Sequence, residues 1–390
     1  MCDMLTVEEH SFYSRQIAVP QIGETGQLAL KRASVLVVGA GGLGCPILLY
    51  LAAAGVGRIG IADADLVSLS NLHRQVIYGV ADCRETKVRT AAAAMRARNP
   101  FVEVVEHAVA IDDENVSDMI SGYDIIVDGT DNFTTKFLLN DACWFLSKPL
   151  VYGSIHRFEG QVAVFNHAGA DATERGPNYR DLFPSPPPAA LAPDCSTAGV
   201  LGVLPGIVGC LQANEVIKLI TGIGEPLSGT LLLVDALSGS TKSMRLKKNP
   251  NNPLSGTSPS IRNVRSVTTS SNVPDMPIRS ISANTLIEWH AQGRPLVLVD
   301  VREPDERKRV SLGGVHWPLS ESDIDVPEID ATRIAVMYCQ SGARSKRAAE
   351  KLIARGYARE HLVSLDGGVT AFLDAGYRPD ALDDPMGGGQ

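Results

Sequence analysis

The chain is 390 residues long, beyond the size at which one hydrophobic core usually stops growing, so we expect at least two domains. A hydrophobic fraction of 44% and a charged fraction of 21% exclude a mainly disordered or fibrous chain. The net charge of −8 argues against a nucleic-acid-binding protein, because such proteins carry a basic surface. The sequence opens without a basic and then apolar leader, so we expect a cytoplasmic protein without a membrane segment.

Composition divides the chain into three parts. Residues 1–248 alternate short β-branched runs, such as Val35–Val38, with alanine-rich segments, which predicts an α/β domain with a parallel sheet and flanking helices. Residues 249–277 are rich in Pro, Ser, Asn and Thr and predict a flexible linker. Residues 278–390 again contain short apolar runs between polar and helical stretches, which predicts a second, smaller α/β domain.

A glycine-rich loop follows the first β-branched run. Gly39, Gly41 and Gly44 have G-x-G-x-x-G spacing, which lets the backbone approach a phosphate at a helix N-terminus. Further along, Asp63 ends the next apolar run, the usual place for a carboxylate that binds ribose hydroxyls. The pattern predicts a Rossmann-like adenine-nucleotide site and by itself fits an NAD-dependent oxidoreductase as well as an ATP-using enzyme.

Polar residues beyond Asp63 favour ATP. Asn71, Arg74 and Gln75 form a compact polar run, and Lys87 is a further cation. Hydride transfer has no need of this cluster, whereas adenylation needs cations, amide donors and Mg²⁺ around the transferring phosphoryl group.

Asp131 follows the next apolar run, at the carboxyl end of a predicted strand, and is our candidate for Mg²⁺ binding through ATP. The simpler interpretations are that Asp131 caps the following helix and that Arg74 and Lys87 are solvated surface charges.

The first 248 residues resemble the ubiquitin-activating superfamily, and within it the bacterial adenylyltransferases that serve sulfur-carrier proteins. The resemblance rests on GAGGLG at residues 39–44, SNLHRQ at 70–75 and FYSRQ at 12–16. It implies a homodimer in which Arg15 reaches the partner's ATP site, and it gives Arg15, Arg74 and Asp131 catalytic roles. It also implies that ATP and Mg²⁺ contact Gly39, Gly41, Gly42, Gly44, Asp63, Asn71, Arg74, Gln75, Lys87, Asp131 and Asn132.

Cys195 lies in a turn-rich segment and is a candidate nucleophile. In similar family members a cysteine at this place bonds to the carrier protein, and the alternative is a bystander thiol. A thioester at Cys195 that passes the carrier to target proteins would make the chain a conjugating activator. Cys210 falls within a helical pattern and is expected in the core.

Many relatives in the family bind zinc through two Cys-x-x-Cys pairs. The seven cysteines of this chain are scattered and never have that spacing, so they predict neither a zinc site nor a disulfide framework. The corresponding segments read Asn178–Asp181 and Asn252–Ser255, and amides and hydroxyls are poor zinc ligands. We therefore expect no zinc.

Cys339 follows an apolar run and precedes a helix-like segment. Loop amides and a helix N-terminus at such a place favour a thiolate or persulfide. The predicted persulfide loop continues through Gln340, Ser341, Gly342, Ala343, Arg344 and Ser345. The spacing from Cys339 to Arg344 is one residue shorter than in cysteine phosphatases, which favours sulfur over a phosphoryl group.

Residues 278–390 resemble single-domain rhodaneses through LVDVRE at 298–303, GGVH at 313–316 and LDGG at 365–368. The resemblance implies a persulfide on Cys339, loaded from thiosulfate or a cysteine desulfurase, and an orienting role for Arg344. Asp300 and Arg302 are expected to be structural.

The fusion of the two domains predicts one enzyme with two activities. It would adenylate the C-terminal glycine of a small ubiquitin-like carrier ending in Gly-Gly and convert it to a thiocarboxylate. The carrier and its pathway, molybdenum cofactor or thiamine biosynthesis among others, stay open, as does a non-catalytic carrier-binding scaffold.

Overall fold

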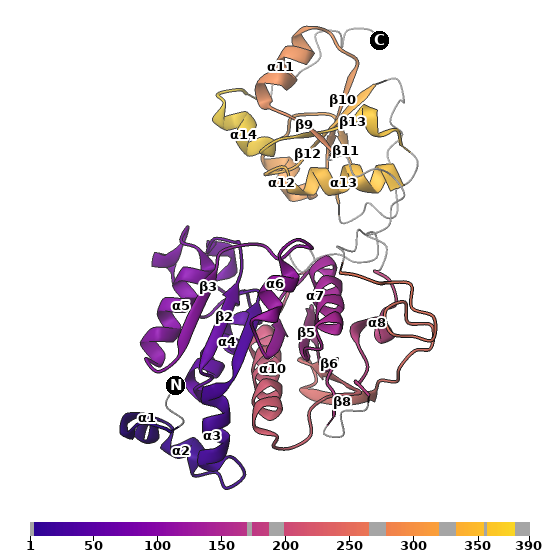
Figure 1. The fold of residues 1–390 in the computed structure, drawn as a ribbon. Coiled ribbons are helices and arrows are strands. Elements are labelled where there is room, and N and C mark those ends of the chain that lie inside the picture. Colours follow the sequence, from indigo (N-terminus) through magenta and orange to yellow (C-terminus); the bar gives the residue numbers. More distant parts are fainter. Residues whose placement is uncertain are drawn as a thin grey trace. The chain divides into compact units, whose positions relative to one another are not determined.

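The computed structural model describes residues 4–169, 174–186, 199–264, 278–319, 333–354 and 357–378. The chain divides into two compact units, Met1–Ser271 and Asn272–Gln390, and each is an α/β domain (Figure 1). The predicted fold class, a Rossmann-like domain with a smaller α/β domain, is confirmed.

One eight-stranded sheet organises the first unit, in the order β3-β2-β1-β4-β5-β6-β7-β8. Its strands are β1 (Ser34–Val38), β2 (Arg58–Ala62), β3 (Glu103–His107), β4 (Ile125–Asp128), β5 (Leu150–His156), β6 (Glu159–Phe165), β7 (Thr230–Asp235) and β8 (Ser240–Arg245). The strands from β3 to β5 are parallel, as the sequence predicts. The strands from β5 to β8 are antiparallel, which was not predicted; tight turns join β5 to β6 and β7 to β8 and reverse the chain direction.

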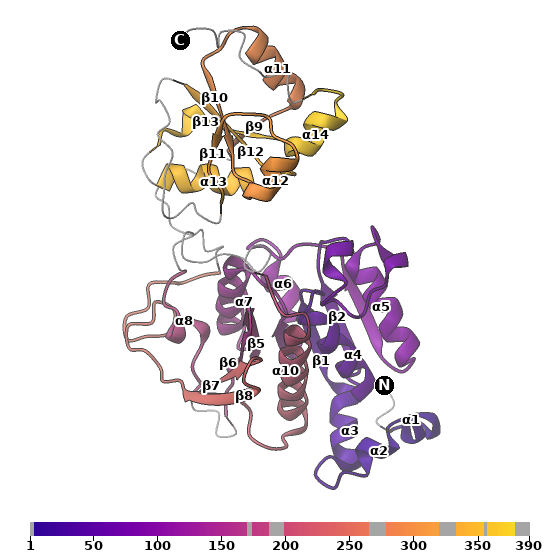
Figure 2. The ribbon, with the colours of Figure 1, turned by 180° about the vertical axis from the view of Figure 1, so that it is seen from behind.

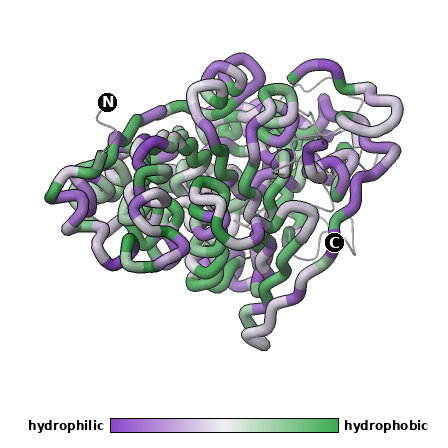
Figure 3. The backbone as a smooth tube through the Cα atoms, turned by 60° about the horizontal axis from the view of Figure 1, so that its bottom comes forward, coloured by the Kyte–Doolittle hydropathy of each residue, from purple (hydrophilic) through white to green (hydrophobic). Residues whose placement is uncertain are grey.

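Helices cover both faces of this sheet (Figures 1 and 2). They are α1 (Val7–Phe12), α2 (Ser14–Ile17), α3 (Gly23–Arg32), α4 (Gly44–Ala54), α5 (Lys87–Arg98), α6 (Val116–Ser121), α7 (Phe133–Phe145), α8 (Tyr179–Leu182) and α10 (Val203–Thr221), with short 3₁₀ turns at η1 (Leu69–Asn71) and η2 (Val80–Asp82). Alternate residues of β1 feed two cores. Val35 and Val37 pack with α4, α5 and α10, whereas Leu36 and Val38 pack with α6 and α7. In Figure 3 hydrophobic and hydrophilic stretches alternate along the coiled segments, as expected for helices with one face against a sheet.

Helix α10 is the one described helix that is long and apolar enough to span a membrane. It packs against α4, α3 and the strands β5 and β6. Its polar residues Gln212 and Glu215 are buried and hydrogen-bonded inside the domain, to the carbonyl of Asp128 and the amide of Leu227. In this structure α10 serves as a core helix.

Residues 249–264 do not form the flexible linker that their composition predicts. Asn252 and Leu254 are 1% and 3% exposed, and Gly256 donates a backbone hydrogen bond to Asn252 over 2.8 Å. The polar side chains that suggest a mobile segment instead bond to one another and to the body of the first unit. Residues 265–277, the rest of the predicted linker, lie outside the described part of the chain.

The second unit contains a five-stranded parallel sheet in the order β11-β10-β12-β13-β9. Its elements are β9 (Arg279–Ile281), α11 (Ala283–Ala291), β10 (Leu296–Asp300), α12 (Pro304–Arg309), β11 (Val315–His316), β12 (Ile334–Tyr338), α13 (Ala343–Ala354), η4 (Arg359–His361), β13 (Leu362–Leu365) and α14 (Gly368–Asp374). The central strand β12 sends Ala335 and Met337 into one core and Val336 and Tyr338 into the other. Cys339 therefore follows the most enclosed strand of this domain.

Candidate functional site

A cavity of about 320 Å³ lies at the carboxyl ends of β1, β2 and β4 in the first unit. Strand β1 pairs with β2 on one side and β4 on the other, so the strand order reverses here, where open α/β sheets bind ligands. Ten of the predicted nucleotide-binding residues line the cavity: Gly39, Gly41, Gly42, Asp63, Asn71, Arg74, Gln75, Lys87, Asp131 and Asn132. Gly44 does not line it and begins α4 instead.

The glycine loop packs tightly against the loop that follows β4. Gly39 has φ +91°, and a Cβ atom there would lie 2.7 Å from the carbonyl oxygen of Gly129. A Cβ on Gly44 would collide with the carbonyl oxygen of Gly39. Only glycine fits these two positions, and the bare backbone leaves room for a phosphate at the start of α4.

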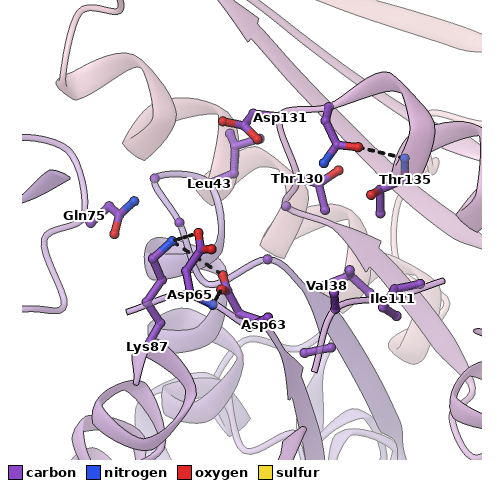
Figure 4. A pocket seen from close by; sticks show the side chains of 18 of the residues that line it. Val38, Leu43, Asp63, Asp65, Gln75, Lys87, Ile111, Thr130, Asp131 and Thr135 are labelled. Atoms are coloured by element: carbon purple, nitrogen blue, oxygen red, sulfur yellow. Dashed lines mark hydrogen bonds and ion pairs between the residues drawn. The ribbon is translucent and has the colours of Figure 1, made fainter. Parts of the chain in front are cut away.

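Asp63 lies between the glycine loop and Lys87. Its Oδ2 accepts the Ala40 N–H over 2.8 Å, and its Oδ1 accepts the Asp65 N–H over 2.8 Å. Lys87 Nζ lies 2.7 Å from Asp65 and 3.8 Å from Asp63, and Figure 4 shows these side chains pointing toward one another. Lys87 is only 4% exposed, so the interpretation of Lys87 as a solvated surface charge is wrong.

The polar run beyond β2 faces the same cavity. Arg74 Nη2 donates to Asn71 Oδ1 over 3.0 Å, which holds the half-buried guanidinium beside the 3₁₀ turn η1. Gln75 is 3% exposed, and its Oε1 has no hydrogen-bond partner among the described residues. A buried amide oxygen without a partner costs free energy unless a ligand satisfies it. The arrangement therefore suits a polar ligand such as a nucleotide.

Asp131 lies on a different side of the cavity from Lys87 (Figure 4). The N-cap of α7 is Asn132, whose Oδ1 accepts the Thr135 N–H over 2.8 Å, so the alternative that Asp131 caps this helix is wrong. The Asp131 carboxylate is exposed and free to take a ligand.

The described residues contain no group of three or more His, Cys, Asp or Glu that could hold a metal ion unaided. Mg²⁺ commonly needs only one or two carboxylates, because substrate phosphates and water supply its other ligands. Asp131 fits that requirement beside a bound nucleotide.

Several lining residues are absent from the sequence prediction. Asp65 contacts Lys87, Thr130 follows β4, and Val109 and Ile111 form an apolar wall after β3. Like the predicted residues, Val109 and Ile111 come shortly after a strand of the parallel sheet, because β3 ends at this edge of the sheet as well. Their side chains are apolar, so they do not stand out as ligand-binding residues in the sequence.

Arg15 and the cysteines of the first unit differ in burial and in their position relative to the cavity. Arg15 lies on α2, is exposed, and does not line the cavity of its own chain. Cys195 lies outside the described residues. Cys210, expected in the core, is half-buried on α10. Cys45, behind the glycine loop, is fully buried, and burial raises its pKa to about 12, which makes it a poor nucleophile.

Four side chains meet where the resemblance seen in the sequence would place two zinc-binding Cys-x-x-Cys pairs: Asn178, Asp181, Asn252 and Ser255. The Asn252 amide donates to Asn178 Oδ1 over 3.1 Å and to Asp181 Oδ1 over 2.7 Å. Asn178 in turn donates to Ser255 Oγ over 2.7 Å. We call these four residues the polar cluster; its hydrogen bonds join the segments at residues 178–181 and 252–255.

The persulfide loop of the second unit begins at the end of β12. Cys339 is fully buried, and its Sγ accepts the Gly342 N–H over 3.1 Å. Ser345 Oγ lies 3.7 Å from Cys339 Sγ and is held by Ser364 at 2.9 Å. The loop thus points the Gly342 amide at the Cys339 sulfur, a donor that favours a thiolate or persulfide, while the Ser345 hydroxyl donates to the Gly342 carbonyl over 2.9 Å.

Arg344 turns toward α12. Its guanidinium makes two 2.6 Å contacts with Glu306, and these hydrogen bonds lower the pKa of Glu306 to about 2. The Arg302–Asp300 pair is completely buried, with Arg302 Nε and Nη2 donating to the carboxylate over 2.9 and 2.8 Å. This buried pair fits the structural role expected for both residues.

Comparisons with known proteins agree with this division. The ThiF family model matches residues 13–254, and the rhodanese-like domain model matches residues 282–375. A probable adenylyltransferase/sulfurtransferase MoeZ of Mycobacterium tuberculosis is 42% identical over 94% of each chain. A sulfur carrier protein adenylyltransferase of Thermus thermophilus is 51% identical over 66% of this chain and 94% of its own.

The fold of the first unit also occurs in solved structures. A crystal structure of E. coli MccB with ATP has a TM-score of 0.54 at 21% identity and covers 62% of this chain and 74% of its own. Both resemblances seen in the sequence are thus confirmed. The chain belongs to the ThiF family and carries a rhodanese-like domain C-terminal to its ThiF domain in the sequence.

Proposed function

We propose that this chain adenylates the C-terminal glycine of a small ubiquitin-like sulfur-carrier protein with ATP and then converts the acyl adenylate into a thiocarboxylate. The observation that carries the proposal is the pairing of two sites in one chain. A nucleotide cavity contains Asp63, Lys87 and Asp131, and a separate loop directs the Gly342 amide at the Cys339 sulfur. The names of the relatives, adenylyltransferase and sulfurtransferase, agree with both halves.

In the first step the glycine loop contacts the phosphates of ATP and Asp63 accepts hydrogen bonds from the ribose. The carrier carboxylate attacks the α-phosphate and pyrophosphate leaves. Arg74 and Lys87 offset the charge that builds up on the phosphate oxygens. Asp131 is the residue that would hold Mg²⁺, which supplies further positive charge beside the phosphates.

In the second step a persulfide on Cys339 attacks the carbonyl carbon of the acyl adenylate, and AMP leaves. The product is an acyl disulfide between the carrier and Cys339. A thiol, for which Cys195 is our candidate, then attacks the Cys339 sulfur. This attack releases the carrier thiocarboxylate and leaves a disulfide between the two cysteines, which two equivalents of a cellular thiol reduce, forming a disulfide of their own.

The persulfide itself comes from a sulfur donor. With thiosulfate, the Cys339 thiolate attacks the outer sulfur and sulfite leaves; a cysteine desulfurase persulfide would deliver the same sulfur atom. We further propose a cytoplasmic homodimer in which the exposed Arg15 reaches the partner's ATP site.

Two other functions have less support. A conjugating activator would use a thioester at Cys195 and would leave the Cys339 loop without a purpose. A nicotinamide oxidoreductase would not need Arg74 and Lys87 at the phosphate side of the cavity, and the relatives named above are adenylyltransferases.

Mass spectrometry of candidate carriers tests the proposal. Each carrier is incubated with ATP, Mg²⁺, thiosulfate and the protein, and we expect a mass gain that corresponds to replacement of one carboxylate oxygen by sulfur. Cys339→Ala should abolish this gain and leave carrier-dependent ATP–pyrophosphate exchange intact, whereas Cys83→Ala, at a partly exposed free thiol, should change neither. Sulfuration by Cys339→Ala at the normal rate would show that the sulfur comes from elsewhere.

A further inference from the structure

A buried ion pair lies directly beneath the loop that carries Asp131. Asp128, the last residue of β4, is completely buried, and Lys136, on the first turns of α7, is 4% exposed. Lys136 Nζ lies 2.9 Å from Asp128 Oδ2 and donates to the carbonyl of Gly153 on β5 over 2.8 Å. The pair therefore ties the two ends of the loop at residues 129–132 to each other and to the neighbouring strand.

The same carboxylate also fixes the loop from inside. Asp128 Oδ1 accepts the N–H of Thr130 over 2.9 Å and its hydroxyl over 2.6 Å. The backbone carbonyl of Asp128 accepts the Gln212 amide from α10 over 2.8 Å. Asp128 is thus fixed by contacts from three elements, and Thr130 is locked to it by two hydrogen bonds.

Asp131 depends on these contacts for its position. Within the described residues, no hydrogen bond or ion pair to the Asp131 side chain is found. Its two neighbours are both restrained, Thr130 by Asp128 and Asn132 by its cap on α7. The carboxylate is therefore placed by the backbone on either side of it and stays free to take a ligand.

Stability does not explain why a charged pair is buried here. Removing two charges from water is costly, and replacing a buried ion pair by neutral groups of similar shape is often neutral or stabilising. A second fully buried pair, Arg180 with Asp141, has the same chemistry but lies away from the nucleotide cavity, with 2.7 Å contacts from Nε and Nη2. The two pairs can therefore be compared in one chain.

We propose that Asp128 and Lys136 are positioning residues of the adenylation site: their ion pair fixes the loop at 129–132 so that Asp131 meets the metal-bound phosphates of ATP. Neither residue lines the cavity, so the pair acts through the loop and does not touch the nucleotide. This role rests on the adenylation function proposed above.

Isothermal titration calorimetry on the full chain with two nucleotides tests the role. The variant Asp128→Asn/Lys136→Met removes both charges and leaves no buried charge unpaired. We expect Mg²⁺·ATP to bind about tenfold more weakly, equivalent to about 1.4 kcal/mol. AMP without Mg²⁺ should bind within about twofold of its normal affinity, less than about 0.5 kcal/mol. The single variant Lys136→Arg, which keeps the positive charge beside Asp128, should retain most of the Mg²⁺·ATP affinity of the unaltered chain.

Matched variants make each outcome decisive. Asp141→Asn/Arg180→Met should leave both affinities unchanged, whatever its effect on thermal stability. If the Asp128 and Lys136 variant misfolds, Thr130→Val, at a residue that lines the cavity, removes the hydroxyl bond to Asp128 and should weaken Mg²⁺·ATP binding more than AMP binding. An equal loss for both nucleotides, or no loss for either, would overturn the positioning role. If the unaltered chain bound neither nucleotide, the proposed adenylation function would be wrong, and so would the positioning role of Asp128 and Lys136.

Discussion

Asn252 donates its side-chain amide to Asp181 across 71 residues of sequence, over 2.7 Å. The same amide donates to Asn178, and the backbone N–H of Asn249 donates to Asp181 over 2.8 Å. Asn252 is 1% exposed, so these bonds are made away from water. A network of neutral amides and one carboxylate thus connects the segment at residues 178–181 with the segment at residues 249–252.

Asn252→Ala should lower the free energy of unfolding by about 1–3 kcal/mol, because it removes a donor to Asn178 and Asp181 and leaves the N–H of the buried Leu254 without its acceptor, Asn252 Oδ1. Chemical denaturation of the full chain measures the loss. The matched control is Asn251→Ala, at the exposed neighbouring asparagine, which should change stability by less than about 0.5 kcal/mol. EDTA should have no effect on the unaltered chain, and stoichiometric zinc in purified protein would contradict this account.

Lys87→Met should weaken ATP binding by at least about tenfold, equivalent to about 1.4 kcal/mol, because it removes a buried cation that lines the cavity. Equilibrium dialysis with labelled ATP measures the change. Arg89→Met is the matched control: Arg89 lies on the same helix, its side chain is 76% exposed, and it forms an ion pair with Glu85 over 3.5 Å. Equal losses in the two variants would mean that net charge, and not the Lys87 position, determines affinity.

Much of the fold follows from strand patterns in the sequence. The β-branched runs of the first unit predict the parallel half of its sheet, because strands buried on both faces leave continuous apolar runs. The antiparallel half is harder to predict. Strand β8 (Ser240–Arg245) is exposed throughout and polar except for Met244, so its residues carry no hydrophobic alternation. It is a strand because its backbone pairs with β7, and amino-acid composition does not predict that pairing.

The nucleotide site is predictable for the same reason. Residues that follow β1, β2 and β4 meet at one edge of the sheet, so their positions in the chain predict their closeness in space. The Asp128–Lys136 pair was not predictable, because a Lys eight residues after an Asp ordinarily suggests two surface charges. Likewise, polar composition misassigned residues 249–264 as linker, since only the three-dimensional partners of Asn252 show that these polar groups are satisfied.

Glu306 should make the persulfide domain sensitive to acid. Pairing with Arg344 lowers the pKa of Glu306 from its ordinary 4.5 to about 2 in the folded protein. A lowered folded-state pKa adds stability that is fully present above pH 4.5 and is lost as the pH falls toward 2. Stability should therefore fall more steeply between these pH values in the unaltered chain than in Glu306→Gln.

NMR titration of the Glu306 side-chain carboxyl carbon tests the cause. Arg344→Met should move the titration midpoint up toward 4.5, because the two hydrogen bonds are gone. Lys346→Met, at a partly exposed lysine on the same helix, should leave the midpoint in place. A midpoint near 4.5 in the unaltered chain would show that the Glu306–Arg344 pair does not form in solution.

Gly342→Ala should slow sulfur transfer from thiosulfate to cyanide by more than about tenfold, equivalent to about 1.4 kcal/mol in the barrier. Gly342 has φ +95°, and a Cβ atom there would lie 3.1 Å from the Gly367 nitrogen, so alanine must shift the loop. The shift moves the Gly342 N–H away from Cys339 Sγ, its 3.1 Å acceptor.

Gly293→Ala separates this effect from ordinary backbone strain. Gly293 also has a positive φ, +65°, but a Cβ there has open space, and the residue lies just beyond α11, away from the persulfide loop. Both alanines should cost about 1–2 kcal/mol of stability, the usual penalty for a left-handed L-residue. Of the two variants, only Gly342→Ala should also slow sulfur transfer, because the Gly342 N–H donates to Cys339 Sγ whereas Gly293 lies outside the persulfide loop. If both variants slowed transfer equally, domain stability and not the amide would control the reaction.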